Sequence, residues 1–448
     1  MEEMDWKQAA KVLSEVLAAD SDNPDALHLM GVTAHRVGLS ESAVGLIERA
    51  IRLKPREPRY HSNCGEIYRR MGKLDLAIAH LRQSLSLDPR YSMAHGNLGS
   101  ALLDQGKIIP AINSFRTAIR LDPNNPEAHW NLSLALLLTG NFEEGWREYD
   151  WRWEASQKQA KRTYPQPQWD GSDLSGRTIL LYSEQGLGDA LQFIRYVPLV
   201  AARGGRVVVE CRPELKRLLE SMPGIVLTAT GESLPQFDVH LPILSLPRVF
   251  GTTLENIPAQ VPYLSPAPDL VRRWQERAGF GRDRLNIGLA WAGNRSHVND
   301  RNRSIPFDTF LPLLDVPGVA FYSLQKGDGA EASPGRQMNP SVVDLTGDLV
   351  DFEDTAALVS HLDLLISVDT AVAHLAGALA KPVWTLLPYV PDWRWMLERD
   401  DSPWYPTMRL FRQTTPGDWA SVIRSVAGEL ADCASRQKDI SPSSRRAR

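Results

Sequence analysis

The hydrophobic positions in the first third of the chain recur with a fixed period of 34 residues. The stretches PDALHLMGVTAHRVG, PRYHSNCGEIYRRMG, SMAHGNLGSALLDQG and PEAHWNLSLALLLTG begin at positions 24, 58, 92 and 126. Each contains a small residue where two helices must approach closely, followed by a turn glycine. A second amphipathic stretch follows each time, and a proline ends the first three of them. The pattern predicts a solenoid of helix pairs over residues 1–159.

This array resembles the tetratricopeptide repeat, which has the same period and the same order of small and large positions. The stretch WKQAAKVLSEVLAAD, residues 6–20, looks like the second helix of a broken first repeat. The resemblance implies a superhelix whose concave face binds extended peptides or partner proteins. An alternative is that so short an array only supports the neighbouring domain. In both cases the periodic apolar residues are core positions, and none is a candidate site.

From residue 177 the pattern changes to short β-branched runs that alternate with helical stretches, which predicts parallel βαβ units. We expect a first lobe over 177–268, with strands at 178–183, 206–210, 225–228 and 237–241 and helices at about 189–203 and 213–221. A second lobe over 269–434 has expected strands at 286–291, 319–324, 342–345, 362–368 and 382–387 and helices near 307–314, 352–361, 370–380 and 416–431. A connecting segment, 160–176, and a polar, basic tail, 435–448, complete the chain. The predicted fold is an α-helical solenoid followed by two Rossmann-like lobes that face a cleft.

Composition and charge narrow the function classes. The 448 residues suggest two or three domains. Lys and Arg total 50 against 54 Asp and Glu, which gives no basic footprint for nucleic acid. The three cysteines are widely separated and form no metal or disulfide pattern. The N-terminus is acidic, and no stretch reaches the roughly 18 apolar residues of a membrane span. We therefore expect a cytoplasmic protein.

The first strand of the first lobe is followed by SEQGLGDALQF, which allows three interpretations. A dinucleotide-binding loop requires Gly or Ala at the position of Leu191, although Glu210 at the end of the second strand suits a ribose. Alternatively, Gly186 and Gly188 form a tight turn that presents Asp189 in the first turn of a helix, as a base aimed into the cleft. In the third interpretation Asp189 only caps that helix.

Polar residues also follow the strands of the second lobe, where sheets of this kind bind their ligands. Arginines and free backbone N–H groups at a helix start suit a diphosphate. The candidates are Asn294, Arg303, Gln325, Lys326, Asp369, Thr370, His374 and, in the aromatic loop 387–413, Arg394. A charged loop is often only solvated, however, and a lone histidine is often a core residue. We find no P-loop motif, no D-x-D pair and no His/Cys cluster in these lobes, so no metal is expected.

The stretches GLGD and DTAVAHLAGALAKPVW make residues 177–432 similar to the GT-B glycosyltransferases, in particular the heptosyltransferase-like family 9. The resemblance implies a catalytic base at Asp189 and a donor site at Asp369, Thr370, Ala371 and His374. Arg303 is the nearest counterpart of a basic residue that contacts donor phosphate in that family. Here Arg303 stands in place of Lys and Ala371 in place of Gly, so the donor need not be ADP-heptose. Repeats joined to a GT-B unit also look like the protein O-GlcNAc transferases.

Taken together, the residues and the resemblance predict a glycosyltransferase. It would move a sugar from a nucleotide-diphosphate sugar to a hydroxyl of a saccharide or protein, with inversion and without a metal or other cofactor. The repeats would bind a protein partner. The alternatives are a non-catalytic tetratricopeptide scaffold with a degenerate GT-B domain, and a dinucleotide-binding enzyme that uses Gly186, Gly188 and Glu210.

Overall fold

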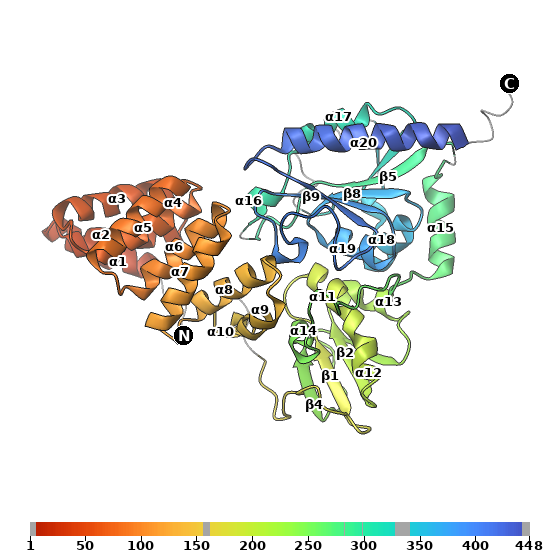
Figure 1. Ribbon diagram of the computed structural model, residues 1–448, viewed down its shortest axis with the longest axis horizontal. Helices are drawn as coiled ribbons and strands as arrows, with labels where there is room; N and C mark the ends of the chain where they lie inside the picture. Colours follow the sequence, from red (N-terminus) through yellow and green to blue (C-terminus); the bar gives the residue numbers. More distant parts are fainter. Residues whose placement is uncertain (1–5, 156–161, 282, 298, 328–340, 441–448) are drawn as a thin grey trace. The chain divides into compact units, whose positions relative to one another are not determined.

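The computed structural model describes residues 6–155, 162–281, 283–297, 299–327 and 341–440 of the chain. These residues divide between two compact units, Met1–Lys158 and Gln159–Arg448 (Figure 1). The described part of the first unit is entirely helical, and the second unit is built on two parallel sheets. This confirms the predicted fold class, a helical solenoid followed by an α/β unit.

The helices of the first unit pack in consecutive pairs, as the 34-residue period predicts. Prolines in the first turn of α2, α4 and α8 and turn glycines with positive φ between paired helices mark the boundaries. In the second repeat, a Cβ on Gly65 would lie 2.6 Å from Leu81 Cγ, so the small residue is required for close helix packing. The helices are α1 (Trp6–Ala19), α2 (Pro24–Arg36), α3 (Ser40–Leu53), α4 (Pro58–Arg70), α5 (Leu74–Leu87), α6 (Ser92–Asp104), α7 (Ile108–Leu121), α8 (Pro126–Leu138), α9 (Phe142–Tyr149) and α10 (Arg152–Ala155).

The first lobe of the second unit is a four-stranded parallel sheet in the order β3-β2-β1-β4. All four strands occur where the sequence predicts them. The connecting segment packs against this sheet, because Trp169 N donates to the His240 carbonyl (2.9 Å) and the Tyr164 ring contacts Tyr182 edge-on. The elements are β1 (Thr178–Tyr182), α11 (Leu187–Phe193), α12 (Val197–Ala201), β2 (Arg206–Cys211), α13 (Lys216–Leu219), β3 (Ile225–Ala229), β4 (Val239–Pro242) and α14 (Leu246–Val249).

The second lobe is a six-stranded parallel sheet in the order β10-β9-β8-β5-β6-β7. The strand order reverses between β5 and β8, because β6 and β7 follow on one side of β5 and the later strands are added on the other side. This is the strand order of a dinucleotide-type Rossmann sheet. Helices α17 and α20 cover one face and α18 and α19 the other (Figure 1). The elements are α15 (Pro268–Ala278), β5 (Leu285–Ala290), α16 (Asp300–Arg303), α17 (Leu311–Leu314), β6 (Val319–Ser323), β7 (Val342–Asp344), α18 (Phe352–Val359), β8 (Leu364–Val368), α19 (Ala371–Ala378), β9 (Val383–Leu387), β10 (Met408–Arg412) and α20 (Trp419–Ile440).

Three expected helices are divided into shorter elements at prolines. The helix predicted at 189–203 consists of α11, a 3₁₀ turn and α12, because Pro198 has no N–H to continue the backbone ladder. The helix predicted at 307–314 begins as a 3₁₀ turn, Phe307–Phe310, before Pro312 in the first turn of α17. The helix predicted at 213–221 is likewise reduced to a 3₁₀ turn that starts at Pro213, followed by the single turn α13.

Several elements were not predicted from the sequence, of which β10 and α15 are the longest. Residues 408–412 were treated as the end of the aromatic loop, but they form β10, which pairs with β9 at the edge of the sheet. Its exposed Arg409 hides the apolar alternation, as charges on edge strands commonly do. Helix α15, which follows the proline-rich stretch, was not predicted either. Among the described residues, no helix is both long enough and apolar enough to cross a membrane.

Candidate active site

The loops after β5 and β8 lie side by side, at the point where the strand order of the second lobe reverses. Ligands of such sheets bind in the crevice at this point. The buried Gln325, which follows β6, fixes the first loop, because its carbonyl oxygen accepts from Trp291 N (3.0 Å) and Ala292 N (2.8 Å) and its amide nitrogen donates to Ala292 O (3.1 Å). The Gln325 side chain is thus engaged by the protein backbone, and it fixes the loop that follows β5.

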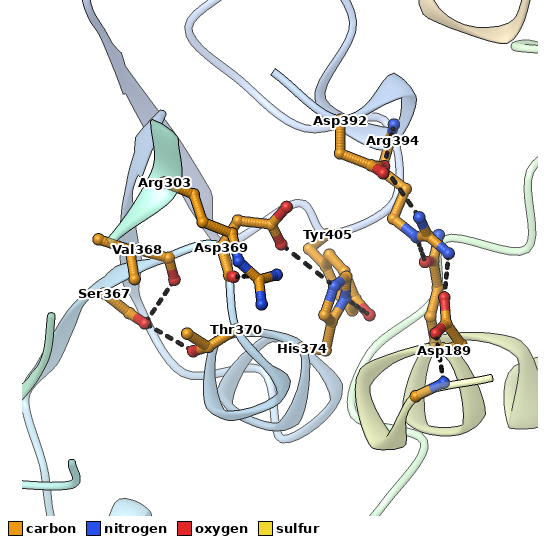
Figure 2. Close-up of polar contacts among 12 residues, drawn as sticks. Asp189, Arg303, Ser367, Val368, Asp369, Thr370, His374, Asp392, Arg394 and Tyr405 are labelled. Atoms are coloured by element: carbon orange, nitrogen blue, oxygen red, sulfur yellow. Dashed lines mark hydrogen bonds and ion pairs between the residues drawn. The ribbon is translucent and has the colours of Figure 1, made fainter. Parts of the chain in front are cut away.

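Arg303, at the end of α16, extends into this crevice with only 15% of its side chain exposed. Its Nη1 donates to the Asp369 carbonyl (3.3 Å) after β8 (Figure 2). Gly293 makes room for the guanidinium, since a Cβ there would lie 2.5 Å from Arg303 Nη2. Asp300 Oδ1 lies 3.5 Å from Nε without the geometry of a hydrogen bond, so this buried donor has no hydrogen-bond partner among the described residues.

Helix α19 begins directly beside Arg303. Thr370 is its N-cap residue, but the Thr370 side chain makes no capping hydrogen bond. Its Oγ1 instead pairs with Ser367 Oγ at 3.0 Å. The first turn of α19, which starts at Ala371, therefore presents backbone N–H groups without a side-chain cap. Such a helix start next to a buried cation favours an anion.

Asp369 and His374 form a buried polar cluster behind that helix start. Asp369 Oδ1 lies 3.7 Å from His374 Nε2, and His374 Nδ1 lies 3.0 Å from the Tyr405 hydroxyl (Figure 2). Trp395 stacks on the imidazole with the ring centroids 5.4 Å apart. Burial alone would raise the pKa of the Asp369 carboxyl, but its interactions with His374, and then with Trp395 and Arg303, hold that pKa below its usual value. Asp369 therefore adds a fixed negative charge beside Arg303.

Asp189 lies in the first turn of α11, on the other lobe. Its Oδ2 accepts from Gly186 N at 2.8 Å, which is the helix cap that the third interpretation expected. Its Oδ1 forms an ion pair with Arg394 of the second lobe (Figure 2). The Asp189 side chain retains 19% exposure. The carboxylate is thus oriented by one donor from each lobe.

The interpretation of both glycines as the turn before Asp189 is wrong. The left-handed residue of that turn is Gln185, with φ of 66°, whereas Gly186 is extended. Gly188 lies inside α11, where a Cβ would come within 2.9 Å of His374 Cδ2. The glycine at 188 is required for the close packing of α11 against α19.

Two other expected residues have partners of their own. Lys326 is exposed and its ammonium donates to the Leu349 carbonyl. Asn294 is exposed in the loop after β5, where its side-chain oxygen accepts from Ser296 N (2.9 Å). Both residues therefore stabilise backbone turns around the crevice.

The sequence analysis did not nominate His297, which belongs to the same loop as Asn294 and Arg303. Burial, and then the Arg303 charge, lowers the pKa of His297, while Asp369, Asp392 and Asp189 oppose that shift. Charged groups of both lobes therefore act on one imidazole. The position of His297 in the sequence, between the candidates Asn294 and Arg303, was the signal that could have indicated it.

Glu210, the residue that suited a ribose, is buried and forms an ion pair with Arg162 of the connecting segment. Its carboxylate is thus neutralised within the protein. Among the described residues, no group of three or more His, Cys, Asp or Glu side chains is placed to hold a metal ion.

Two segments of the chain match models of known protein families. Residues 65–106 and 99–140 match the TPR repeat model, and residues 330–422 match glycosyltransferase family 9 (heptosyltransferase). The chain is thus similar to tetratricopeptide repeats in its first third and to family 9 glycosyltransferases near its end. The match to that family includes β8, α19 and the Arg394 loop, and Asp189 and Arg303 lie outside the matched segment.

The chain is also similar to the protein FlbA of Caulobacter vibrioides, with 30% identity over 325 residues. That alignment covers 66% of this chain and 53% of FlbA, so the chain spans about half the length of this curated relative. Among solved structures, MamA from Desulfovibrio magneticus covers 35% of this chain and 89% of its own (20% identity, TM-score 0.30). Pseudomonas aeruginosa PilF covers 35% and 71% (21% identity, TM-score 0.32).

Proposed function

We propose that the chain is a glycosyltransferase that moves a sugar from a nucleotide-diphosphate sugar to an acceptor hydroxyl. The observation that carries this proposal is the Arg303 guanidinium, whose buried Nε has no hydrogen-bond partner among the described residues and which lies beside the uncapped start of α19. A buried donor without a partner costs free energy unless a ligand satisfies it. A diphosphate would supply an acceptor oxygen for this donor.

In this proposal the donor binds to the second lobe. Arg303 and the first amides of α19 hold the diphosphate, and Thr370 adds a hydroxyl. Gln325 shapes the crevice through the loop that it fixes. The exposed Lys326 ammonium adds positive charge at its edge. Cationic and dipolar groups then stabilise the leaving diphosphate, so the reaction needs no metal ion.

Asp189 would act as the general base. The acceptor hydroxyl gives its proton to the Asp189 carboxylate while its oxygen attacks the anomeric carbon, and the bond to the diphosphate oxygen breaks on the opposite side. Attack from the opposite side inverts the anomeric configuration. A carboxylate has about four lone-pair positions, so the two donors already bound to Asp189 leave room for the hydroxyl.

The acceptor would be a saccharide or a protein, and the repeats would bind a protein partner. The three cysteines are unpaired, which suits a reducing compartment such as the cytoplasm. A second candidate function is a non-catalytic scaffold, favoured by the engagement of both Asp189 oxygens. A dinucleotide enzyme is less well supported, because Glu210 is paired with Arg162.

A ligand panel tests the proposal. The melting temperature would be measured with UDP-, ADP- and GDP-sugars and with NAD(H), each with and without a chelator. We expect one class of nucleotide sugar to raise the melting temperature and to do so equally in the chelator, because binding stabilises the folded state by mass action. Stabilisation by NAD(H) alone would overturn the proposal. Stabilisation by a nucleotide sugar without transfer or donor hydrolysis would instead favour the scaffold.

A further inference from the structure

Arg394 connects the second lobe to the candidate base. It lies in the loop between β9 and β10, and its side chain is only 9% exposed. Its Nε donates to Gln192 Oε1 of α11 at 2.5 Å and its Nη2 to Asp189 Oδ1, while Nη1 donates to Asp392 Oδ1 at 2.9 Å (Figure 2). The guanidinium therefore binds two side chains of the first lobe through two different nitrogens.

The loop holds Arg394 in this position before any substrate arrives. Asp392 Oδ1 also accepts from Arg394 N at 3.0 Å, which closes the short turn that carries the arginine. The guanidinium carbon lies 4.4 Å from the centroid of the Trp393 ring and 5.9 Å from that of Phe193. The Trp393 and Phe193 rings and the Asp392 carboxylate together leave the guanidinium little rotational freedom. Such a group can orient another side chain.

The same loop also contacts the donor crevice. Trp395, the next residue but one after Trp393, stacks on His374, which lies 3.7 Å from Asp369. One short turn therefore contacts the base of the first lobe through Arg394 and the crevice of the second lobe through Trp395. The turn therefore links the Asp189 carboxylate, which Arg394 contacts, to His374 of the second lobe, which Trp395 contacts.

The geometry points to Arg394 as a positioning residue that orients the Asp189 carboxylate when the two lobes are aligned. The sequence suggested a donor contact for Arg394, but its guanidinium is committed to Asp189, Gln192 and Asp392. The inference rests on the proposed glycosyl transfer. Arg394 itself exchanges no proton and forms no bond with either substrate, because the proton moves from the acceptor hydroxyl to Asp189.

The test compares Arg394→Gln, Arg394→Lys and the control Arg399→Gln in the full chain. Arg399 belongs to the same loop but pairs with the exposed Asp401. For Arg394→Gln we expect kcat to fall about 100-fold, since misplacement of a reacting group by about 1 Å costs that much. The donor Kd should stay within about twofold, because the guanidinium is engaged by Asp189, Gln192 and Asp392 and makes no contact with the donor in this proposal. Arg394→Lys should recover part of kcat, because a lysine ammonium can still donate to the Asp189 carboxylate but cannot reproduce the planar fork of the guanidinium.

A double-mutant cycle with Asp189→Asn then separates positioning from a general structural role. If Arg394 acts through Asp189, Arg394→Gln should lower the residual rate of Asp189→Asn by less than about threefold, against about 100-fold in the wild type. Additive losses would overturn the inference, as would a weaker donor Kd with unchanged kcat. If Arg394→Gln does not fold, the split between kcat and Kd in Arg394→Lys decides. A wild-type protein without transfer or donor hydrolysis overturns the proposed function and this inference with it, whereas normal transfer by the wild type with an unaltered kcat in Arg394→Gln overturns the inference alone.

Discussion

The two sheets of the second unit have the same strand arrangement at their centres but differ in the chemistry of the loops that follow. The order β3-β2-β1-β4 of the first lobe repeats as β7-β6-β5-β8 in the second. In the first lobe the acidic residues after β1 and within β2 have partners, since Asp189 binds Arg394 and Glu210 binds Arg162. In the second lobe, Arg303 retains a buried donor without a hydrogen bond.

This difference teaches that strand order alone does not define a ligand site. Both lobes have a reversal of strand order at which a ligand could bind. Among the described residues, buried polar atoms without a hydrogen bond occur in both lobes, for example Gln192 Nε2 in the first, and each costs about 1–3 kcal/mol. Arg303 in the second lobe differs because it also carries the positive charge that a diphosphate requires. On this argument we propose that the second lobe binds the donor and that the first lobe supplies an oriented base. The predictions below test each half of that division.

Asp189→Asn should have the largest effect. Removal of a general base typically lowers the rate by about 10²–10⁴-fold, and the neutral amide cannot take the acceptor proton. Donor affinity should change little, since the diphosphate binds to the other lobe. Steady-state transfer and donor titration measure the two quantities, with the exposed Asp170→Asn as the matched control. Transfer at the wild-type rate in Asp189→Asn would remove the catalytic role from the first lobe.

Arg303→Gln should weaken donor binding by about 2 kcal/mol, or roughly 30-fold, because a hydrogen bond to a charged group contributes about that much. The control is Arg301→Gln, an exposed arginine in the same short helix. Calorimetric titration with the stabilising nucleotide sugar gives both affinities. Equal losses in the two variants would mean that general positive charge, and no specific contact, binds the donor.

Gly293→Ala should reproduce part of that loss without removing a charge. The new Cβ would lie 2.5 Å from Arg303 Nη2, so the guanidinium must move away from the Asp369 carbonyl. We expect the donor Kd to rise about tenfold, less than for the loss of the arginine, since the displaced side chain can still reach the phosphates. In Gly347→Ala, where a Cβ would meet nothing within 4 Å, the Kd should not change. An unchanged Kd in Gly293→Ala would show that the observed position of Arg303 is not needed for binding.

The repeats could be predicted well from the sequence because each repeat contacts only its neighbours. The residues that pack together therefore recur at the same positions of every repeat. The sequence also predicted that the residues after β5 and β8 come together, and Arg303 indeed contacts Asp369. The pairing of Asp189 with Arg394 could not be predicted, because the two residues are 205 positions apart and belong to different lobes. The role of Gly188 was misjudged for the same reason, since the contact that requires a glycine there comes from His374.

Glu210→Gln should have the smallest effect on donor binding, and this is the sharpest test of the difference between the lobes. The variant removes the ion pair between Glu210 of the first lobe and the partly exposed Arg162 of the connecting segment, so we expect a loss of stability of about 1.5–3 kcal/mol, which lowers the melting temperature by several degrees. Arg162→Gln should lose a similar amount, and the double variant should lose less than the sum, because the two residues share one interaction. The donor Kd should stay within about twofold in all three. A Kd for a nucleotide that depends on Glu210 but not on Arg162 would show that the carboxylate binds a ligand, in which case the first lobe would also be a binding lobe.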